Sequence, residues 1–113
     1  MDCIFCQIAA GELPAERVYE DEDTLAFPDL RPRAPHHLLV IPKRHLDSLA
    51  GARDEDWPAV AACLRTVAHV ARTRGMDQAG YRVVANVGAD GGQTVNHLHW
   101  HVLGGRLMTW PPG

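Results

Sequence analysis

The chain has 113 residues, of which 46% are hydrophobic and 22% are charged, and its formal net charge is −3. That length is sufficient for a single domain over residues 1–113 with one hydrophobic core. The slight negative charge gives no general attraction to nucleic acid or to an anionic membrane, so a phosphate-bearing ligand would have to be held by local contacts. No apolar run approaches a membrane span and the N-terminal residues lack the regions of a signal peptide, which predicts a cytoplasmic protein.

The first motif, Cys3-Ile4-Phe5-Cys6, places two thiols at a spacing that zinc sites and redox pairs both use. The redox interpretation is the weaker one, because Gly11 and Pro14 leave room for only a short turn of helix after Cys6. A zinc ion would need two more ligands, which histidines elsewhere in the chain can supply. The alternative is that both cysteines are ordinary small core residues.

A strand-like pattern follows. Strands at Arg17–Glu20 and Thr24–Pro28 with a short acidic turn between them read as a hairpin, and residues 29–35 form a loop stiffened by two prolines. A further strand is expected at His37–Ile41, closed by Pro42. Because side chains alternate along a strand, residues 37, 39 and 41 share one face of it.

One long helix is predicted from Asp54 to Arg74. Asp54 can cap its start, Pro58 falls in the first turn, where proline is tolerated, and Gly75 follows as a stop. Its apolar residues recur at three- and four-residue spacing and should form one buried stripe: Trp57, Val60, Ala61, Leu64, Val67, Ala68 and Ala71. We expect Cys63 to be a buried thiol and His69 to lie in solvent without a role.

The chain ends with a strand at Tyr81–Val87, a glycine-rich turn over residues 86–96, and a strand at His97–Leu103. Alternation along the last strand places His97, His99 and His101 on one face, which indicates a proton-handling site or a metal site rather than a solvated histidine face. The turn has neither P-loop nor dinucleotide-binding spacing, but its consecutive amides can bind an anion. The expected class is therefore α+β, with about five antiparallel strands and the helix packed on the apolar face.

Several segments together resemble the histidine-triad (HIT) superfamily, and its Hint branch in particular. They are His97-x-His99-x-His101, Gly92–Val95, Phe27–Leu30, Leu39–His45 and Trp110–Gly113, and the likeness extends over nearly the whole chain. The resemblance implies a HIT-like fold that dimerises into a continuous sheet. The edge strand at 81–87 would pair with its counterpart in the second copy, since an open apolar edge favours pairing.

The resemblance also implies a nucleotide hydrolase or transferase. It would cleave a purine nucleoside 5′-phosphoramidate, or a related AMP- or GMP-type substrate, through a covalent nucleotidyl-histidine intermediate. By matching position, His99 would be the nucleophile, His101 would bind a phosphate oxygen, and His97 with His37 would form the supporting relay. Thr94 would protonate the leaving amine.

Substrate binding is assigned by the same resemblance. Asp29 would bind the ribose hydroxyls and Gln93 would contact the oxyanion, within a loop that also includes Asn86, Gly92, Thr94 and Val95. Five apolar residues would form the wall of the base site, although ordinary core packing explains them equally well: Phe5, Ile8, Phe27, Leu30 and Leu39. The chain differs from the common Hint pattern at Pro28, Thr94, Asn96 and Trp100, which leaves purine preference and leaving group open.

Many bacterial HIT proteins bind zinc through a Cys-x-x-Cys motif, a histidine after the Pro-Lys turn and the first triad histidine. The matching residues here are Cys3, Cys6, His45 and His97. The implied zinc is structural and is not required for the chemistry. As a ligand, His97 would orient the strand instead of acting as a relay base.

Two other functions fit the residues. In one, His97, His99 and His101 hold a catalytic zinc ion, although alternate residues on a strand lie about 6.5 to 7 Å apart, so the strand would have to bend. In the other, the protein binds nucleotides as an interaction module and its dimer surfaces recruit partners. Trp110, in the C-terminal segment, looks exposed, which suggests docking against another surface.

Overall fold

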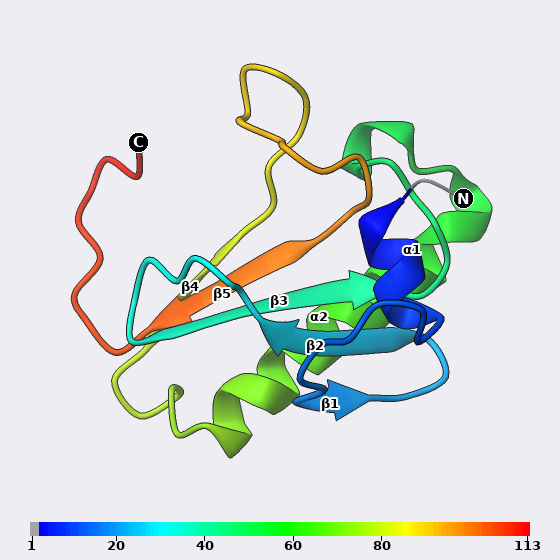
Figure 1. The fold of residues 1–113 in the computed structure, drawn as a ribbon. Helices are drawn as coiled ribbons and strands as arrows, with labels where there is room; N and C mark the ends of the chain where they lie inside the picture. Colours follow the sequence, from blue (N-terminus) through cyan, green and yellow to red (C-terminus); the bar gives the residue numbers. More distant parts are fainter. Residues whose placement is uncertain (1–2) are drawn as a thin grey trace.

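The computed structural model describes residues 3–113. Met1 and Asp2, which begin the N-terminal stretch that lacks signal-peptide features, lie outside the described residues. Five antiparallel strands form one sheet in the order β1-β2-β3-β5-β4, which confirms the α+β class. The elements are α1 (Ile4–Ala9), β1 (Tyr19–Glu20), β2 (Thr24–Pro28), β3 (His36–Pro42), α2 (Trp57–Thr73), β4 (Tyr81–Val84) and β5 (Trp100–Gly104), with short 3-10 turns at Leu49–Gly51 and Asp54–Asp56 (Figure 1).

The central strand β3 has apolar residues on both faces, and each face meets a different helix. Leu38 and Val40 pack with residues of α2 such as Val67, forming the larger core. Leu39 and Ile41 point to the other face, where the short helix α1 covers them. Figure 1 shows α1 across the end of the sheet where β3 terminates, so α1 does not reach the start of β3.

The buried side of α2 differs from the predicted stripe. Val60, Val67 and Ala71 are buried as expected, but Trp57 and Leu64 are 47% and 45% exposed, and Ala61 is also exposed. The helix instead directs a second set of residues inward, Ala62, Cys63, Thr66 and Val70. Hydrophobicity alone misplaced the face because Thr66 is buried by a hydrogen bond, its hydroxyl lying 2.7 Å from that of Thr24 on β2.

The last two strands are shorter than predicted. β4 ends at Val84 instead of Val87, because the loop that follows makes its own hydrogen bonds, including one from the Asn86 side chain to the Gly91 carbonyl. β5 begins at Trp100 instead of His97. Residue 98 donates its amide to the Leu46 carbonyl, so this segment is tied to the loop after β3 and not to the sheet.

The remaining boundaries agree with the sequence within one or two residues. β2 has the predicted bounds, β3 is one residue longer at each end, and β1 is limited to two residues. The first turn of the predicted long helix is a 3-10 turn, so α2 itself starts at Trp57 and Gly75 follows its end with φ +72°. Within residues 3–113 no helix has both the length and the apolar character needed to cross a membrane.

The corrected orientation of α2 can be tested by comparing two substitutions. Val70 is fully buried, so Val70→Ala should lower the free energy of unfolding by about 2 kcal/mol. Leu64→Ala removes more carbon atoms, yet it should cost less than about 1 kcal/mol because the side chain is already half in solvent. Urea denaturation of both variants measures the difference; a larger loss for Leu64→Ala would contradict the observed packing.

Candidate active site and metal centre

On the same face of the sheet as α1, beyond the end of that helix, lie three histidines. They come from two neighbouring strands and from the segment before one of them. In the register between β3 and β5, His37 lies opposite Leu103 and Leu39 lies opposite His101. His37 and His101 are therefore diagonal neighbours on one face, and their ring centroids are 5.1 Å apart. His99 joins them from just before β5, with its ring centroid 5.1 Å from that of His101.

His99 has its tautomer fixed by the main chain. Its Nδ1 lies 2.8 Å from the carbonyl oxygen of His97, in a buried contact. A carbonyl oxygen can only accept, so Nδ1 carries the proton and donates it. Neutral His99 must then have a bare Nε2 with its lone pair available.

His101 has its tautomer fixed by a longer chain of contacts that also starts at the main chain. The amide of Arg33 donates to His37 Nδ1 at 2.9 Å, so the proton of neutral His37 is on Nε2. His37 Nε2 lies 2.9 Å from His101 Nδ1 and donates to it. The proton of neutral His101 is therefore on its own Nε2.

The two adjacent imidazoles consequently have opposite tautomers. His99 offers a bare nitrogen at Nε2, which can act as a nucleophile, while His101 offers an N–H group at Nε2, which can donate to an anion. Neither Nε2 atom is used by the contacts that set the tautomers. The Phe5 ring packs against the His99 ring in a T-shaped contact with 5.1 Å between the ring centroids, which restricts rotation of the imidazole.

Burial keeps His101 and His37 neutral. It lowers the pKa of His101 to about 4, helped by the nearby His99 and His37, and opposed by the Asp29 carboxylate. Burial also lowers the pKa of His37, which Asp29 again opposes. One Asp29 oxygen lies 3.4 Å from His37 Nε2, and the other accepts the amide of Arg31.

His97 turns its ring away from this group and into a second cluster with Cys3, Cys6 and His45. Its Nδ1 lies 3.2 Å from Cys3 Sγ, 3.5 Å from Cys6 Sγ and 3.1 Å from His45 Nδ1. Cys6 Sγ lies 3.3 Å from His45 Nδ1. The structure therefore places the carbonyl oxygen of His97 at His99, while the His97 ring belongs to this cluster, as expected for a metal ligand.

The donor set of this second cluster fits a metal ion. His97 Nε2 donates to the Pro42 carbonyl at 2.9 Å, and His45 Nε2 donates to Asp47 at 2.8 Å, so each ring has its lone pair on Nδ1. Two lone pairs that face each other at 3.1 Å cannot hydrogen-bond, whereas both can bind a cation between them. A histidine ligand that donates its other N–H to a carbonyl or carboxylate is the usual arrangement at zinc.

The thiols complete a tetrahedral set of two sulfurs and two nitrogens whose ligand atoms all lie within 4.8 Å of one another. In the metal-free protein, burial and the neighbouring Cys3 raise the pKa of Cys6 to about 11, so its thiol keeps its proton. A bound cation would displace that proton, because the thiolate is the ligand form.

Comparison with known proteins agrees with this geometry. Residues 10–108 match the model of the HIT domain. The chain belongs to the HIT domain family. It is 49% identical over 112 residues to an uncharacterised HIT-like protein of Synechococcus elongatus, covering 99% of this chain and 97% of the relative.

Solved structures of HIT proteins superpose closely on this one. A HIT family hydrolase from Legionella pneumophila has a TM-score of 0.96 at 50% identity, covering 99% of this chain and all of the other. A histidine triad protein from Clostridium difficile has a TM-score of 0.93, also at 50% identity, covering 96% and 95%.

The predicted wall of the base site is mostly core in this HIT domain. Four of its residues are 5% to 8% exposed and pack with Leu25 and Ile41 between α1 and the sheet: Phe5, Ile8, Phe27 and Leu39. Leu30, by contrast, is 96% exposed and does not belong to this cluster.

The glycine-rich loop of the HIT domain is held by its own contacts, which changes two predictions. Both N–H groups of the Gln93 side chain donate to carbonyls, those of Asp47 and Val95, so the side chain does not offer its donors to an oxyanion. The Gly92 amide donates to the Ala89 carbonyl inside the loop, which removes it from the predicted anion-binding group. A Cβ on Gly91 would collide with the Val87 carbonyl, so this turn requires glycine.

Thr94, the predicted proton donor, is exposed and lines a hollow of about 430 Å³ with Cys3, His45, Asp47 and Asn96 among its other residues.

The alternative zinc site made of His97, His99 and His101 is not formed. Among the described residues the two groups of converging ligand atoms are the Cys3 cluster and a set of Asp29, His37 and His101. The second set is unsuited to a metal, because the Arg33 amide holds the His37 proton on the nitrogen that would have to bind it.

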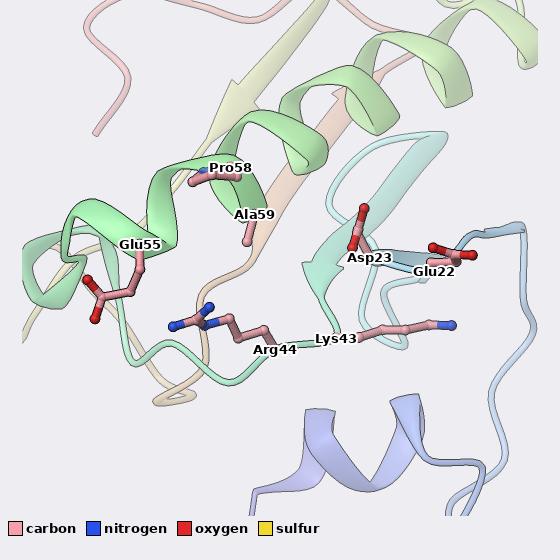
Figure 2. Close-up of a pocket in the computed structure, with 7 residues that line it drawn as sticks. All are labelled: Glu22, Asp23, Lys43, Arg44, Glu55, Pro58 and Ala59. Carbon is pink, nitrogen blue, oxygen red and sulfur yellow. The ribbon is translucent and has the colours of Figure 1, made fainter.

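A further hollow, of about 260 Å³, lies beside the start of α2 and holds none of the triad histidines. Figure 2 shows the Lys43 and Arg44 side chains pointing in opposite directions. Both cations are already paired, Lys43 with Glu20 at 2.7 Å and Arg44 with Asp56 at 2.7 Å. The two cations of this hollow are therefore engaged in ion pairs with carboxylates.

The lowered pKa values predict a loss of stability in acid. Between pH 6.5 and about 4 the unfolded chain takes up protons on His37 and His101 that the folded protein excludes. The free energy of unfolding should therefore decrease as the pH falls through this window. Urea denaturation across it should show a shallower decline for His101→Gln than for wild type, while His69→Gln controls for the loss of a histidine outside the site; equal slopes would contradict the prediction.

Proposed function

We propose that this protein is a nucleotide hydrolase or transferase of the Hint type, cleaving purine nucleoside 5′-phosphoramidates or related nucleotidyl substrates. The observation that carries the proposal is the pair of opposite tautomers at His99 and His101, which supplies a nucleophile and an anion donor side by side. Two similar proteins of known structure are named HIT family hydrolases, which supports the same class of reaction.

In the first step, His99 Nε2 forms a bond to the α-phosphorus while the bond to the leaving amine breaks. The attacking imidazole gains positive charge, and its Nδ1–H is already bonded to the His97 carbonyl, which stabilises that charge. His101 Nε2–H donates to a non-bridging oxygen, where negative charge develops. The departing amine takes a proton, for which exposed Thr94 is the proposed donor.

In the second step, water attacks the phosphorus of the nucleotidyl-His99 intermediate and gives a proton back to Thr94. The bond between phosphorus and His99 Nε2 breaks, which releases the nucleoside monophosphate and neutral His99. Asp29 is the proposed ligand of the ribose hydroxyls, because one of its oxygens is held by the Arg31 amide while the other faces the histidines. Leu30 lies on the same loop with its side chain almost fully exposed, and it is the proposed apolar contact for the base.

The nucleophile can be tested directly. His99→Ala should lower turnover of adenosine 5′-phosphoramidate by roughly three orders of magnitude or more, because no other group replaces the attacking nitrogen. It should still bind AMP, since Asp29 and the base contacts remain. Rapid quenching of the wild type followed by mass spectrometry should find the nucleotide on His99.

His69→Ala is the matched control, because this histidine lies on α2 and packs against Tyr19 of β1, and the substitution should leave turnover unchanged. Wild-type turnover by His99→Ala would overturn the assignment.

We further propose that Cys3, Cys6, His45 and His97 hold one structural zinc ion. When bound, the ion would cross-link the N-terminal helix, the loop after β3 and the segment before β5. Support comes from the convergence of two thiols with two imidazole lone pairs. Within residues 3–113, the Nδ1 atoms of His45 and His97 contact only each other and the two sulfurs.

Removal of the thiols tests the zinc site. Protein purified without chelator should contain near one zinc per chain, and Cys3→Ser with Cys6→Ser should lose the metal together with several degrees of melting temperature. Cys63→Ala is the matched control and should keep its zinc. The Cys63 thiol is fully buried in the larger core between α2 and the sheet, where burial raises its pKa to about 12. Metal-free wild type with readily alkylated Cys3 and Cys6 would contradict the proposal.

A homodimer is the proposed assembly. β4 is an edge strand of the sheet, and its Tyr81 and Val83 side chains are 36% and 38% exposed. Trp110 in the C-terminal segment is 81% exposed, and Trp57 on α2 is half exposed. A second copy that continues the sheet through β4 would cover an open strand edge.

A further inference from the structure

The loop over residues 29–36 meets the turn after β5 at two points. The Arg106 guanidinium donates twice to one acceptor, the carbonyl oxygen of Arg33, from Nε at 3.2 Å and from Nη2 at 2.9 Å. One residue earlier, Gly105 lies so close to Pro35 that a Cβ would come within 2.8 Å of the proline ring. The C-terminal turn therefore packs directly on this loop.

Arg33 uses its two backbone groups in opposite directions. Its carbonyl oxygen points out to Arg106, while its amide donates to His37 Nδ1 at 2.9 Å. The second contact is the one that fixes the proton of His37 on Nε2 and, through His37, the proton of His101 on Nε2. The first contact thus holds the residue on which both tautomers depend.

The loop has few other means of holding residue 33. Pro32 and Pro35 have no amide hydrogen, so two backbone donors are lost next to it. The remaining contacts of the loop are near its ends, where the Asp29 amide donates to the His37 carbonyl and the Arg31 amide donates to Asp29. A charged donor with two bonds to one carbonyl is a strong restraint by comparison.

We propose that Arg106 is a positioning residue for the triad: by holding the Arg33 carbonyl it keeps the Arg33 amide on His37 and thereby fixes the tautomer of His101. The kinetic part of this inference rests on the proposed function. The tautomers themselves are a property of the folded protein without substrate, so they can be measured independently of turnover.

The test uses the full chain with its histidines labelled with 15N, at a pH where His37 and His101 are neutral. Protonated and bare imidazole nitrogens have well-separated 15N shifts, so each tautomer is read directly. In wild type, Nε2 of His37 and His101 should be protonated, and Nδ1 of His99 should be protonated. In Arg106→Gln, the His37 and His101 signals should move toward the average of two tautomers, while His99 should not change because its acceptor is the His97 carbonyl.

Two further variants make the result specific. Arg106→Lys keeps a cationic donor and should restore the wild-type shifts in part. Arg82→Gln is the matched control, because Arg82 also donates to a carbonyl of the C-terminal segment, that of Thr109 at 2.9 Å, but has no contact with the His37 loop. It should leave all three histidines unchanged.

For turnover of adenosine 5′-phosphoramidate, Arg106→Gln should lower kcat by about threefold to tenfold with little change in KM, as expected for a donor that acts on developing charge. Thermal melting identifies a variant that fails to fold, and Arg106→Lys then provides the comparison. Unchanged His37 and His101 shifts in a folded Arg106→Gln protein would overturn the inference. Absence of turnover in wild type with the assigned tautomers intact would instead count against the proposed function alone.

Discussion

The hydrogen bond from His99 Nδ1 to the carbonyl of His97 is the contact on which the rest of the site depends. It requires the chain to leave the extended conformation before Trp100, since in a regular strand this carbonyl would point to a neighbouring strand. The same departure turns the fully buried His97 ring toward Cys3 and Cys6 and brings its Nε2–H to the Pro42 carbonyl. One residue thus connects the N-terminal helix, the end of β3 and the proposed nucleophile.

Main-chain groups, and not charged side chains, determine the proton positions of the triad. A carboxylate behind an imidazole would raise its pKa and favour the imidazolium, which has no lone pair to attack with. A carbonyl behind His99 and an amide behind His37 select one tautomer each and do not titrate. Burial then keeps His37 and His101 neutral, against the pull of Asp29. His37 and His101 therefore keep their neutral form near neutral pH.

Much of the fold could be predicted from the sequence, because alternation in β2 and β3 and the caps of α2 are local signals. The face of α2 could not, since the burial of Thr66 depends on a hydroxyl of β2. For the site, the spacing of the histidines indicated that their side chains lie near one another. It did not indicate that β5 begins only at Trp100, nor that the His97 ring turns away from His99 and His101. The roles of the Arg33 amide and the His97 carbonyl have no sequence signal, because every residue carries the same backbone groups.

The register between β3 and β5 links the core to the chemistry. On one face of β3, Leu39 and Ile41 lie under α1 and His37 lies beyond its end, so a single strand serves as core at one end and as active site at the other. A slip of one residue would turn His37 toward α2 and place Leu38 under α1. The His37 imidazole would then be buried among the apolar residues around Val67 without its Arg33 and His101 partners. The free-energy cost of burying this unpartnered polar ring exceeds the cost of replacing one leucine by another at the same face of the sheet. The paired histidines therefore help to specify the register that aligns them.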